Sequence, residues 1–307
     1  MTAVARWDAV SRRYRGVTAV DAVSLGLEAG QVTALVGHNG AGKTTLIKLL
    51  LGLIRPSAGS VQVGGIDPAG SRGAEARRAI GFLPESVAFH GAMTGRELMA
   101  FYARLKGQPQ RSSAALLEQV GIAHAADRRV ATYSKGMRQR LGIAQALIGA
   151  PRLVLFDEPT SGLDPASRSD VYRMIGALRD GGATVLVSTH ALAEVQDRVD
   201  RAAIMHRGRL LAAGTLAELR QGAAAEVRIR ARVQPDAGAR VLAAMPAGVR
   251  CVEHAGASLT LQAAAGAKMP ALRALAEAGD LVEDVETSAP GLQELYDRLV
   301  GSAGVAA

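Results

Sequence analysis

The chain has 307 residues and a net charge of +8, and nearly half of its residues are apolar, so it can bury one large core and a small one. Its single cysteine, Cys251, excludes an internal disulfide and a cysteine-based metal cluster; we interpret it as a small residue in a strand. No uninterrupted apolar run reaches the roughly 18 residues that span a bilayer, and the amino-terminal residues lack the apolar stretch of a secretory signal, so we expect a cytoplasmic protein.

The charge is unevenly distributed along the chain. Residues 223–307 contain eight basic and ten acidic side chains, which leaves a net charge of +10 for residues 1–222. A basic body suits nucleic acid, the anionic inner face of a membrane, or arginines that are simply solvated. Charge alone therefore leaves the partner open.

Three short apolar runs, at residues 32–36, 153–156 and 184–187, predict buried strands of a parallel sheet. Each run is followed by a loop and then by a helical pattern, which is typical of an α/β domain. Between residues 84 and 150 the pattern changes to helix, and we expect a helical subdomain at about 85–150, inserted into the α/β domain.

One helix of that insertion has a marked start. Thr94 and Glu97 are spaced as a capping box, in which each side chain bonds the backbone N–H of the other residue. The residues that follow predict one apolar helix face, formed by Leu98, Phe101, Tyr102 and Leu105.

A second domain is expected at residues 223–307, after an alanine-rich linker at 223–225. Apolar residues and arginines alternate over residues 227–233, which predicts a half-exposed strand. The rest of the pattern indicates a small accessory α+β domain, with strands near 250–254, 258–262 and 281–287 and helices near 270–278 and 291–300.

The segment from Gly37 to Thr44 matches the glycine-rich loop G-x-x-x-x-G-K-[ST], between a predicted strand and a predicted helix. Glycines let successive backbone N–H groups face phosphates at the positive end of a helix. Lys43 would reach the β- and γ-phosphates of a nucleotide, and the Thr44 hydroxyl would bind Mg²⁺. We expect the nucleotide to be bound by Gly37, His38, Asn39, Gly40, Ala41, Gly42, Lys43, Thr44 and Thr45, with no chemistry assigned to His38.

Two carboxylates, Asp157 and Glu158, end the apolar strand that begins at Leu153. Acidic residues at the carboxyl end of a buried parallel strand face the ligand crevice of such a sheet. Asp157 would hold Mg²⁺ through water or through Thr44, and Glu158 would polarise the attacking water. An apolar run followed by an acid occurs at many strand ends, but its pairing with the phosphate loop makes this signal strong.

The segment from Tyr133 to Arg140, Y-S-K-G-M-R-Q-R, resembles the ABC signature, which is usually L-S-G-G-Q. With both nucleotide motifs in this order, the chain resembles the ATP-binding subunit of an ABC transporter. The resemblance implies an ABC ATPase of the α/β P-loop NTPase class, with an inserted helical subdomain in residues 1–222 and the small α+β domain after it. ATP and Mg²⁺ are the cofactors that it implies.

Further positions match the family one by one. Tyr14 lies upstream of the phosphate loop, where the family places an aromatic ring that stacks on adenine; a tyrosine of the core is the alternative. The S-G-L-D segment that ends at Asp164 resembles the D-loop, which crosses the dimer interface. His190 resembles the switch histidine that contacts the γ-phosphate. The resemblance thus implies a catalytic set of Lys43, Glu158 and His190.

Two departures from the family pattern stand out. Glu85 replaces the Q-loop glutamine; its carbonyl oxygen can still bind Mg²⁺ or water, but its charge would tune turnover. In the signature, Lys135 replaces the first glycine and Met137 the glutamine, while Ser134 and Gly136 keep the hydroxyl and the close backbone approach. Lys135 either adds a cation at the site or points to solvent.

In ABC proteins the signature belongs to the partner's nucleotide site, and this chain carries one set of motifs. The resemblance therefore implies a homodimer that clamps two ATP molecules and drives an integral-membrane permease from the inner face of the cell membrane. The transported cargo, the transport direction, the role of residues 223–307 and the oligomeric state without nucleotide are left open by the sequence.

Longer segments, at residues 82–89, 95–98, 101–107 and 121–130, resemble the ATPase of the nitrous-oxide reductase maturation system. That resemblance implies copper-centre assembly with a periplasmic copper-handling protein, reached through the permease. Nothing in this chain resembles a copper site, so partners would handle the metal.

Three other functions are compatible with some of the same residues. The ATPase of a general drug or lipid exporter would need the same motifs. A soluble ABC ATPase acting on nucleic acid is disfavoured, because such proteins usually carry two motif sets or a long coiled-coil insertion; we therefore expect no nucleic-acid partner. A module that binds nucleotide without hydrolysis is disfavoured by Glu158 and His190.

Overall fold

The computed structural model describes residues 3–110, 112–222 and 226–305, which fall into two compact units that meet between Thr215 and Leu216. The division lies before the expected one, which follows Gly222. Helix α8 (Leu216–Gly222) packs with α11 (Leu292–Val305), and the Arg220 side chain donates a hydrogen bond of 2.9 Å to the Pro290 carbonyl. These contacts place α8 in the second unit. The expected linker at 223–225 lies outside the described residues.

The first unit is built on a six-stranded sheet in the order β5-β6-β7-β3-β8-β9, in which only β9 runs antiparallel to its neighbour. Every residue of β3, β6 and β7 is buried, which explains their largely apolar sequences and confirms the three expected strands. The strands are β3 (Val32–Val36), β5 (Ile80–Leu83), β6 (Leu153–Asp157), β7 (Thr184–Thr189), β8 (Arg201–His206) and β9 (Arg209–Gly214).

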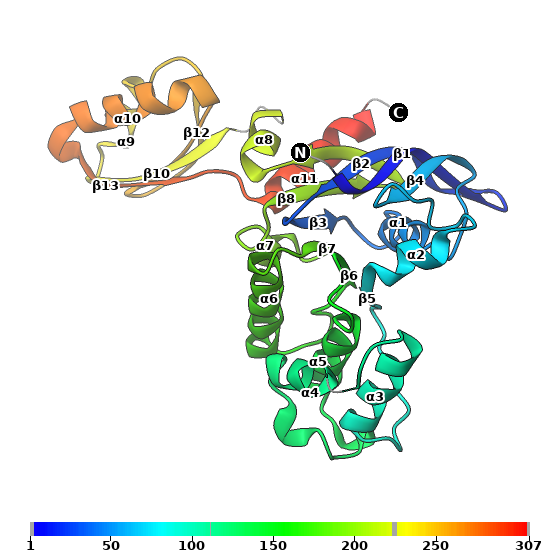
Figure 1. The fold of residues 1–307 in the computed structure, drawn as a ribbon. Helices are drawn as coiled ribbons and strands as arrows, with labels where there is room; N and C mark the ends of the chain where they lie inside the picture. Colours follow the sequence, from blue (N-terminus) through cyan, green and yellow to red (C-terminus); the bar gives the residue numbers. More distant parts are fainter. Residues whose placement is uncertain (1–2, 111, 223–225, 306–307) are drawn as a thin grey trace. The chain divides into compact units, whose positions relative to one another are not determined.

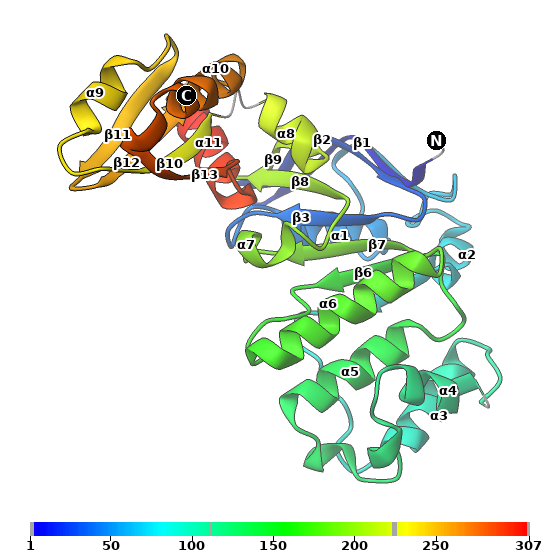
Figure 2. The ribbon, with the colours of Figure 1, turned by 90° about the vertical axis from the view of Figure 1, so that its left-hand side faces the viewer.

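A second, antiparallel sheet in the order β2-β1-β4 lies beside it (Figures 1 and 2). The fully buried Trp7 of β1 connects this sheet to helix α1, because its indole N–H donates to the Leu46 carbonyl at 3.3 Å. The strands are β1 (Ala3–Tyr14), β2 (Val17–Glu28) and β4 (Ala58–Val63), and the helices near the sheets are α1 (Lys43–Leu50), α2 (Gly73–Arg78), α6 (Pro165–Asp180) and α7 (Leu192–Val195).

Three helices form a separate layer of the first unit: α3 (Gly95–Leu105), α4 (Ser112–Gln119) and α5 (Lys135–Ala146) (Figures 1 and 2). The capping box that we expected at the start of α3 is present, since Thr94 and Glu97 each accept the other's backbone N–H. No helix in the described part of the chain is both long enough and apolar enough to cross a membrane.

The expected apolar face of α3 is corrected by the structure. Leu98 is buried, but Phe101 and Leu105 are 40% and 68% exposed, whereas Met99 and Ala103 are fully buried. The buried stripe is rotated toward the residues that contact α4 and α5, and helical spacing alone could not show which side those helices would cover. The ring of Tyr102 instead meets Phe101 edge-on at 5.4 Å.

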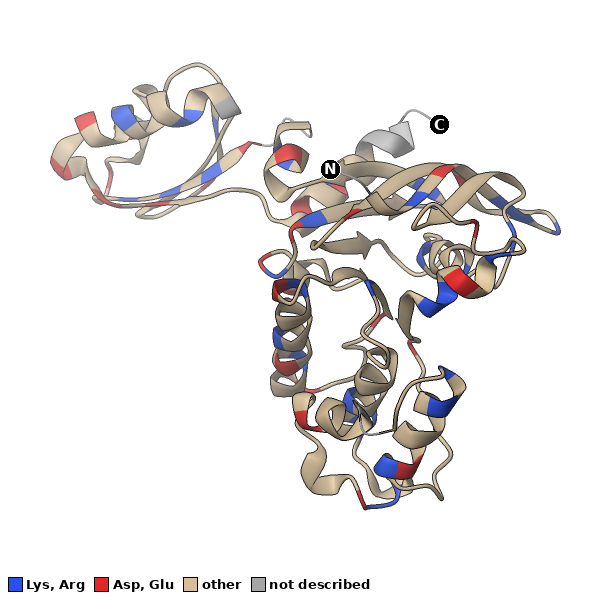
Figure 3. Ribbon diagram, in the orientation of Figure 1, with Lys and Arg blue, Asp and Glu red and all other residues tan. Residues whose placement is uncertain are grey.

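The second unit contains one antiparallel sheet in the order β11-β12-β10-β13, with α9 and α10 on one face (Figure 1). Ile229, Leu259 and Leu261 belong to the core beneath these helices. The arginines of β10 alternate with its buried residues, and Arg230 and Arg232 lie opposite the acidic Glu286 and Asp284 of β13. Figure 3 shows basic and acidic residues along these strands. The elements are β10 (Val227–Val233), α9 (Gly238–Ala243), β11 (Val249–Ala255), β12 (Ser258–Ala263), α10 (Lys268–Glu277) and β13 (Val282–Ser288).

Candidate functional site

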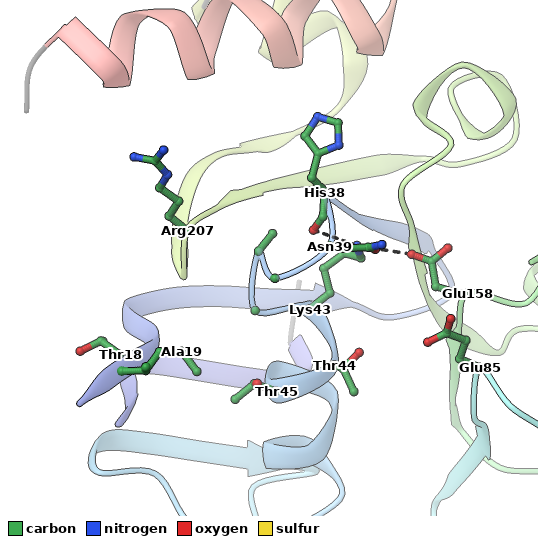
Figure 4. Close-up of a pocket in the computed structure, with 14 residues that line it drawn as sticks. Thr18, Ala19, His38, Asn39, Lys43, Thr44, Thr45, Glu85, Glu158 and Arg207 are labelled. Atoms are coloured by element: carbon green, nitrogen blue, oxygen red, sulfur yellow. Dashed lines mark hydrogen bonds and ion pairs between the residues drawn. The ribbon is translucent and has the colours of Figure 1, made fainter. Parts of the chain in front are cut away.

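A pocket of about 480 Å³ opens where β3 ends and α1 begins (Figure 4). Its lining includes the phosphate loop from His38 to Thr45, which the sequence predicted. Glu85 and Glu158 approach the same space from the ends of β5 and β6, as expected for carboxylates that follow buried parallel strands. The remaining lining residues are Val17, Thr18, Ala19 and Arg207.

Close backbone approach explains two glycines of the loop. A Cβ atom on Gly37 would lie 2.5 Å from the Met205 carbonyl oxygen of β8. Gly42 has a φ of +102°, and a Cβ there would lie 2.7 Å from the Ala19 carbonyl oxygen. Any other residue at these positions would push the loop away from its neighbours, so the motif glycines set the shape of the loop as well as its flexibility.

Two side chains, Lys43 and His190, contact the Glu158 carboxylate. The Lys43 ammonium lies 3.3 Å from Glu158 Oε1 and donates a 2.5 Å hydrogen bond to the Gly37 carbonyl, and His190 Nδ1 lies 2.9 Å from Glu158 Oε2. Lys43 and Glu158 are both buried, whereas the His190 side chain is 54% exposed. The structure thus brings together the three residues of the expected catalytic set.

The backbone of Glu158 is held in an unusual conformation. Its φ is +48°, in the left-handed region, which costs a residue with a side chain roughly 1–2 kcal/mol. Its N–H donates to the Ser188 hydroxyl at 2.9 Å, and that hydroxyl donates to Asp157 Oδ1 at 2.5 Å. Ser188 of β7 therefore orders both carboxylates at the end of β6.

The oxygen ligands present suit Mg²⁺. Thr44 offers an exposed hydroxyl and Glu85 an exposed carboxylate, and Asp157 has one carboxylate oxygen beyond the one that Ser188 bonds. Within the described residues, no group of three or more His, Cys, Asp or Glu side chains could hold a metal ion unaided. Mg²⁺ is commonly bound by one or two protein carboxylates together with the phosphates of a nucleotide.

The signature residues lie outside the pocket lining. Ser134 is exposed and caps α5 by accepting the Met137 N–H at 3.2 Å, and Gly136 lies in the first turn of the same helix. Lys135 is exposed, with its ammonium beside Gly162 of the same chain, where an added Cβ would be 2.1 Å away. Burial raises the pKa of the neighbouring Tyr133, whose hydroxyl donates to the Ala125 carbonyl.

Two other expected site residues are also away from this pocket lining. Asp164 is exposed and caps α6, and its hydrogen bond from Ser167 lowers the pKa of its carboxyl. Tyr14 is 43% exposed at the end of β1, and the Arg12 guanidinium lies over its ring at 4.6 Å. Its stacking on adenine stays a prediction.

Two residues near the phosphate loop or the carboxylates of β6 were not predicted from the sequence. Arg207, in the turn between β8 and β9, lines the pocket, and the next residue, Gly208, donates to the Ala41 carbonyl at 3.1 Å. No sequence motif marks this turn. It lies beside the phosphate loop because β8 is the neighbour of β3 in the sheet. Ser188 could have been noticed, because it lies two residues before His190 on the same strand.

Comparison with known proteins identifies the family of the chain. Residues 20–161 match the family model described as "ABC transporter". The chain is 35% identical to the daunorubicin resistance ATP-binding protein DrrA3 of Streptomyces coeruleorubidus, over 96% of this chain and 95% of that protein. It is 39% identical to the daunorubicin/doxorubicin resistance ATP-binding protein DrrA of Streptomyces peucetius, over 70% of this chain.

The chain spans 66% of that second relative, and 64% of an uncharacterised ABC transporter ATP-binding protein of Synechocystis sp. with which it is 40% identical. A solved structure titled as the ATP-binding subunit of an ABC transporter aligns with a TM-score of 0.66 at 30% identity. That alignment covers 71% of this chain and 92% of the solved one, and its fold is the α/β ABC ATPase fold described above.

Proposed function

Because the chain belongs to the family of ABC transporter ATP-binding subunits, we propose that it hydrolyses ATP to drive a membrane permease. One observation carries this proposal: Glu158 is held between Lys43 and His190 at the mouth of the phosphate loop. A carboxylate in that place can accept a proton from a water molecule directed at the γ-phosphate.

Each residue of the site has a separate role in this mechanism. The phosphate loop binds the triphosphate through its backbone, and Lys43 exchanges its contact with Glu158 for the β- and γ-phosphates. Thr44, Asp157 and Glu85 would hold Mg²⁺, which supplies charge neutralisation at the phosphates. Glu158 then accepts the proton of the attacking water, while His190 orients the Glu158 carboxylate.

The test is steady-state ATP hydrolysis by the purified chain and two variants. Lys43→Ala should lose both nucleotide binding and turnover. Glu158→Gln should keep binding and lose turnover by at least about a hundred-fold, because it removes the proton acceptor and not the phosphate contacts. Hydrolysis by Glu158→Gln at the normal rate would show that another group is the base.

The placement of the signature supports a homodimer. Ser134 and Gly136 lie outside the pocket that Lys43 and Glu158 line, so in our proposal a second copy supplies them to each ATP. We also propose that the dimer works in the cytoplasm, on the inner face of the membrane that holds the permease. ATP binding would close the dimer, and hydrolysis would reopen it and move the permease.

For the transported substrate, the drug or lipid exporter is the better supported reading. The DrrA3 protein, which aligns over nearly the whole chain, is named for daunorubicin resistance. The copper-centre function and the copper-handling partner stay predictions. The two relatives named above for drug resistance have no reference to copper in their names.

Expression of the chain with the permease that copurifies should raise the tolerated daunorubicin concentration, and Glu158→Gln should abolish the gain. An unchanged tolerance together with copper-dependent nitrous-oxide reductase activity would favour the copper reading.

A further inference from the structure

A buried amide on the signature helix reaches the segment that follows Glu158. Gln139, in α5, is 7% exposed, and its Nε2 donates a 2.7 Å hydrogen bond to the Pro159 carbonyl. Pro159 is the residue directly after Glu158, whose φ of +48° is unfavourable for a residue with a side chain. A strained conformation persists only where its surroundings hold it in place.

The strained residue is held from two sides. On the side of β7, the Ser188 hydroxyl and carbonyl both accept the Glu158 N–H, at 2.9 and 3.2 Å. On the side of α5, the contact is the bond from Gln139 to Pro159. Pro159 has no N–H, so its carbonyl is the one backbone polar group that this residue itself offers to a partner.

The same helix contacts the next part of this segment at two further points. The Gly136 backbone lies so close to the Ser167 hydroxyl that an added Cβ would be 3.3 Å from it, and the Lys135 ammonium lies beside Gly162. Of these three contacts, only the one from Gln139 is a buried hydrogen bond. It is also the one next to Glu158.

We propose that Gln139 is a positioning residue for hydrolysis, which holds Glu158 of its own chain in the geometry that directs water at the γ-phosphate. In the proposed dimer, α5 begins at the signature and contacts the ATP that is bound to the partner. The bond from Gln139 would connect that ATP to Glu158 of the chain that carries the helix. The inference rests on the proposed ATPase function and on the proposed dimer. Gln139 is not among the residues that line the pocket, so we expect nucleotide binding at the phosphate loop to be independent of it.

The test substitutes Gln139→Met, which keeps the length of the side chain and removes the donor. We expect kcat for ATP to fall at least ten-fold while KM stays close to wild type; the melting temperature should fall by only a few degrees, as for the loss of one buried hydrogen bond. Gln139→Asn keeps the amide but is one methylene too short to reach Pro159, and should show the same fall. Gln145→Met is the matched control: Gln145 is on the same helix, is partly buried, and its side chain bonds no group in the described part of the chain.

A second measurement separates positioning from damage to the signature. In the Glu158→Gln background the base is already absent, so adding Gln139→Met should leave the ATP-trapped dimer fully formed. Loss of that dimer, a KM that rises while kcat is retained, or an unchanged kcat would each overturn the proposal. If the wild-type chain neither hydrolyses ATP nor dimerises with it, the ATPase proposal has failed, and the two failures are thereby distinguished.

Discussion

The phosphate loop and the signature form the two halves of the proposed nucleotide site. A single chain completes the half around the loop but not the half around the signature. Around the loop, Lys43 and Glu158 are buried and paired with each other, and the pocket is formed by one chain alone. At the signature, Ser134 and Lys135 are exposed at the start of α5, outside that pocket.

This difference indicates which part of the free energy of ATP binding a single chain gains and which part is available for closing the dimer. Backbone and charge at the loop are arranged before nucleotide arrives, so the first contacts with the phosphates need little rearrangement. In the proposed dimer, the exposed start of α5, capped by Ser134, would contact phosphate only when a second copy presents a nucleotide to it. The comparison predicts the largest effect on the dimer that joins both halves, a smaller loss at the signature, a few-fold change at the edge of the loop, and the smallest effect outside both halves.

The largest effect concerns the dimer. Glu158→Gln with ATP and Mg²⁺ should trap a homodimer, because both halves can bind while hydrolysis cannot release them. Without nucleotide, we expect mostly monomer unless the second unit holds two copies together. Light scattering after size-exclusion chromatography measures both states, and a monomer under both conditions would contradict the division into two half-sites.

A smaller loss is expected at the signature. Ser134→Ala removes a hydroxyl that would bond a charged phosphate, an interaction that contributes about 1.5–3 kcal/mol, so kcat should fall about ten-fold or more. Binding of a fluorescent nucleotide to the monomer should be unchanged, since Ser134 lies outside the pocket. Weakened binding by the monomer would show that the signature serves its own chain's loop.

A substitution of Glu85 tests a position at the edge of the pocket that the phosphate loop forms. Its exposed carboxylate lines the pocket where the family has glutamine, and Glu85→Gln removes one negative charge near Mg²⁺ and the triphosphate. We expect a few-fold rise in basal ATPase, which corresponds to about 0.5–1 kcal/mol in the barrier, and a weaker dependence on the permease. Steady-state rates with and without permease in lipid check both, and equal values for the two forms would end the idea of an electrostatic brake.

The smallest effect on hydrolysis is expected in the helical subdomain away from both halves. Thr94→Ala removes one side of the capping box of α3, at a cost of about 1 kcal/mol in stability. The melting temperature should fall by about 2–4 °C, while the ATPase rate of the isolated chain stays at its wild-type value. Calorimetry and an ATPase assay on the same sample measure this, and a large loss of rate would show that α3 also positions the site.

Some features followed from the sequence because their cause is local. The glycine-rich loop, the strand that ends in Asp157 and the cap at Thr94 each depend on a few adjacent residues, and the buried strands needed only short, largely apolar runs. The face of α3 was not predicted correctly, because Phe101 and Met99 are both apolar and only the packing of α4 and α5 distinguishes them.

By itself, the sequence determined which groups the chain offers for nucleotide chemistry: a lysine after glycines, two carboxylates at a strand end, and a histidine after another strand. Only the tertiary structure decided that Glu158 lies between Lys43 and His190. It also decided that Gln139 donates a hydrogen bond to the residue that follows Glu158. The physical reason is that these contacts join separate strands and a distant helix. Their distances depend on the order of the strands in the sheet and on how closely the backbones approach, which no short run of residues encodes.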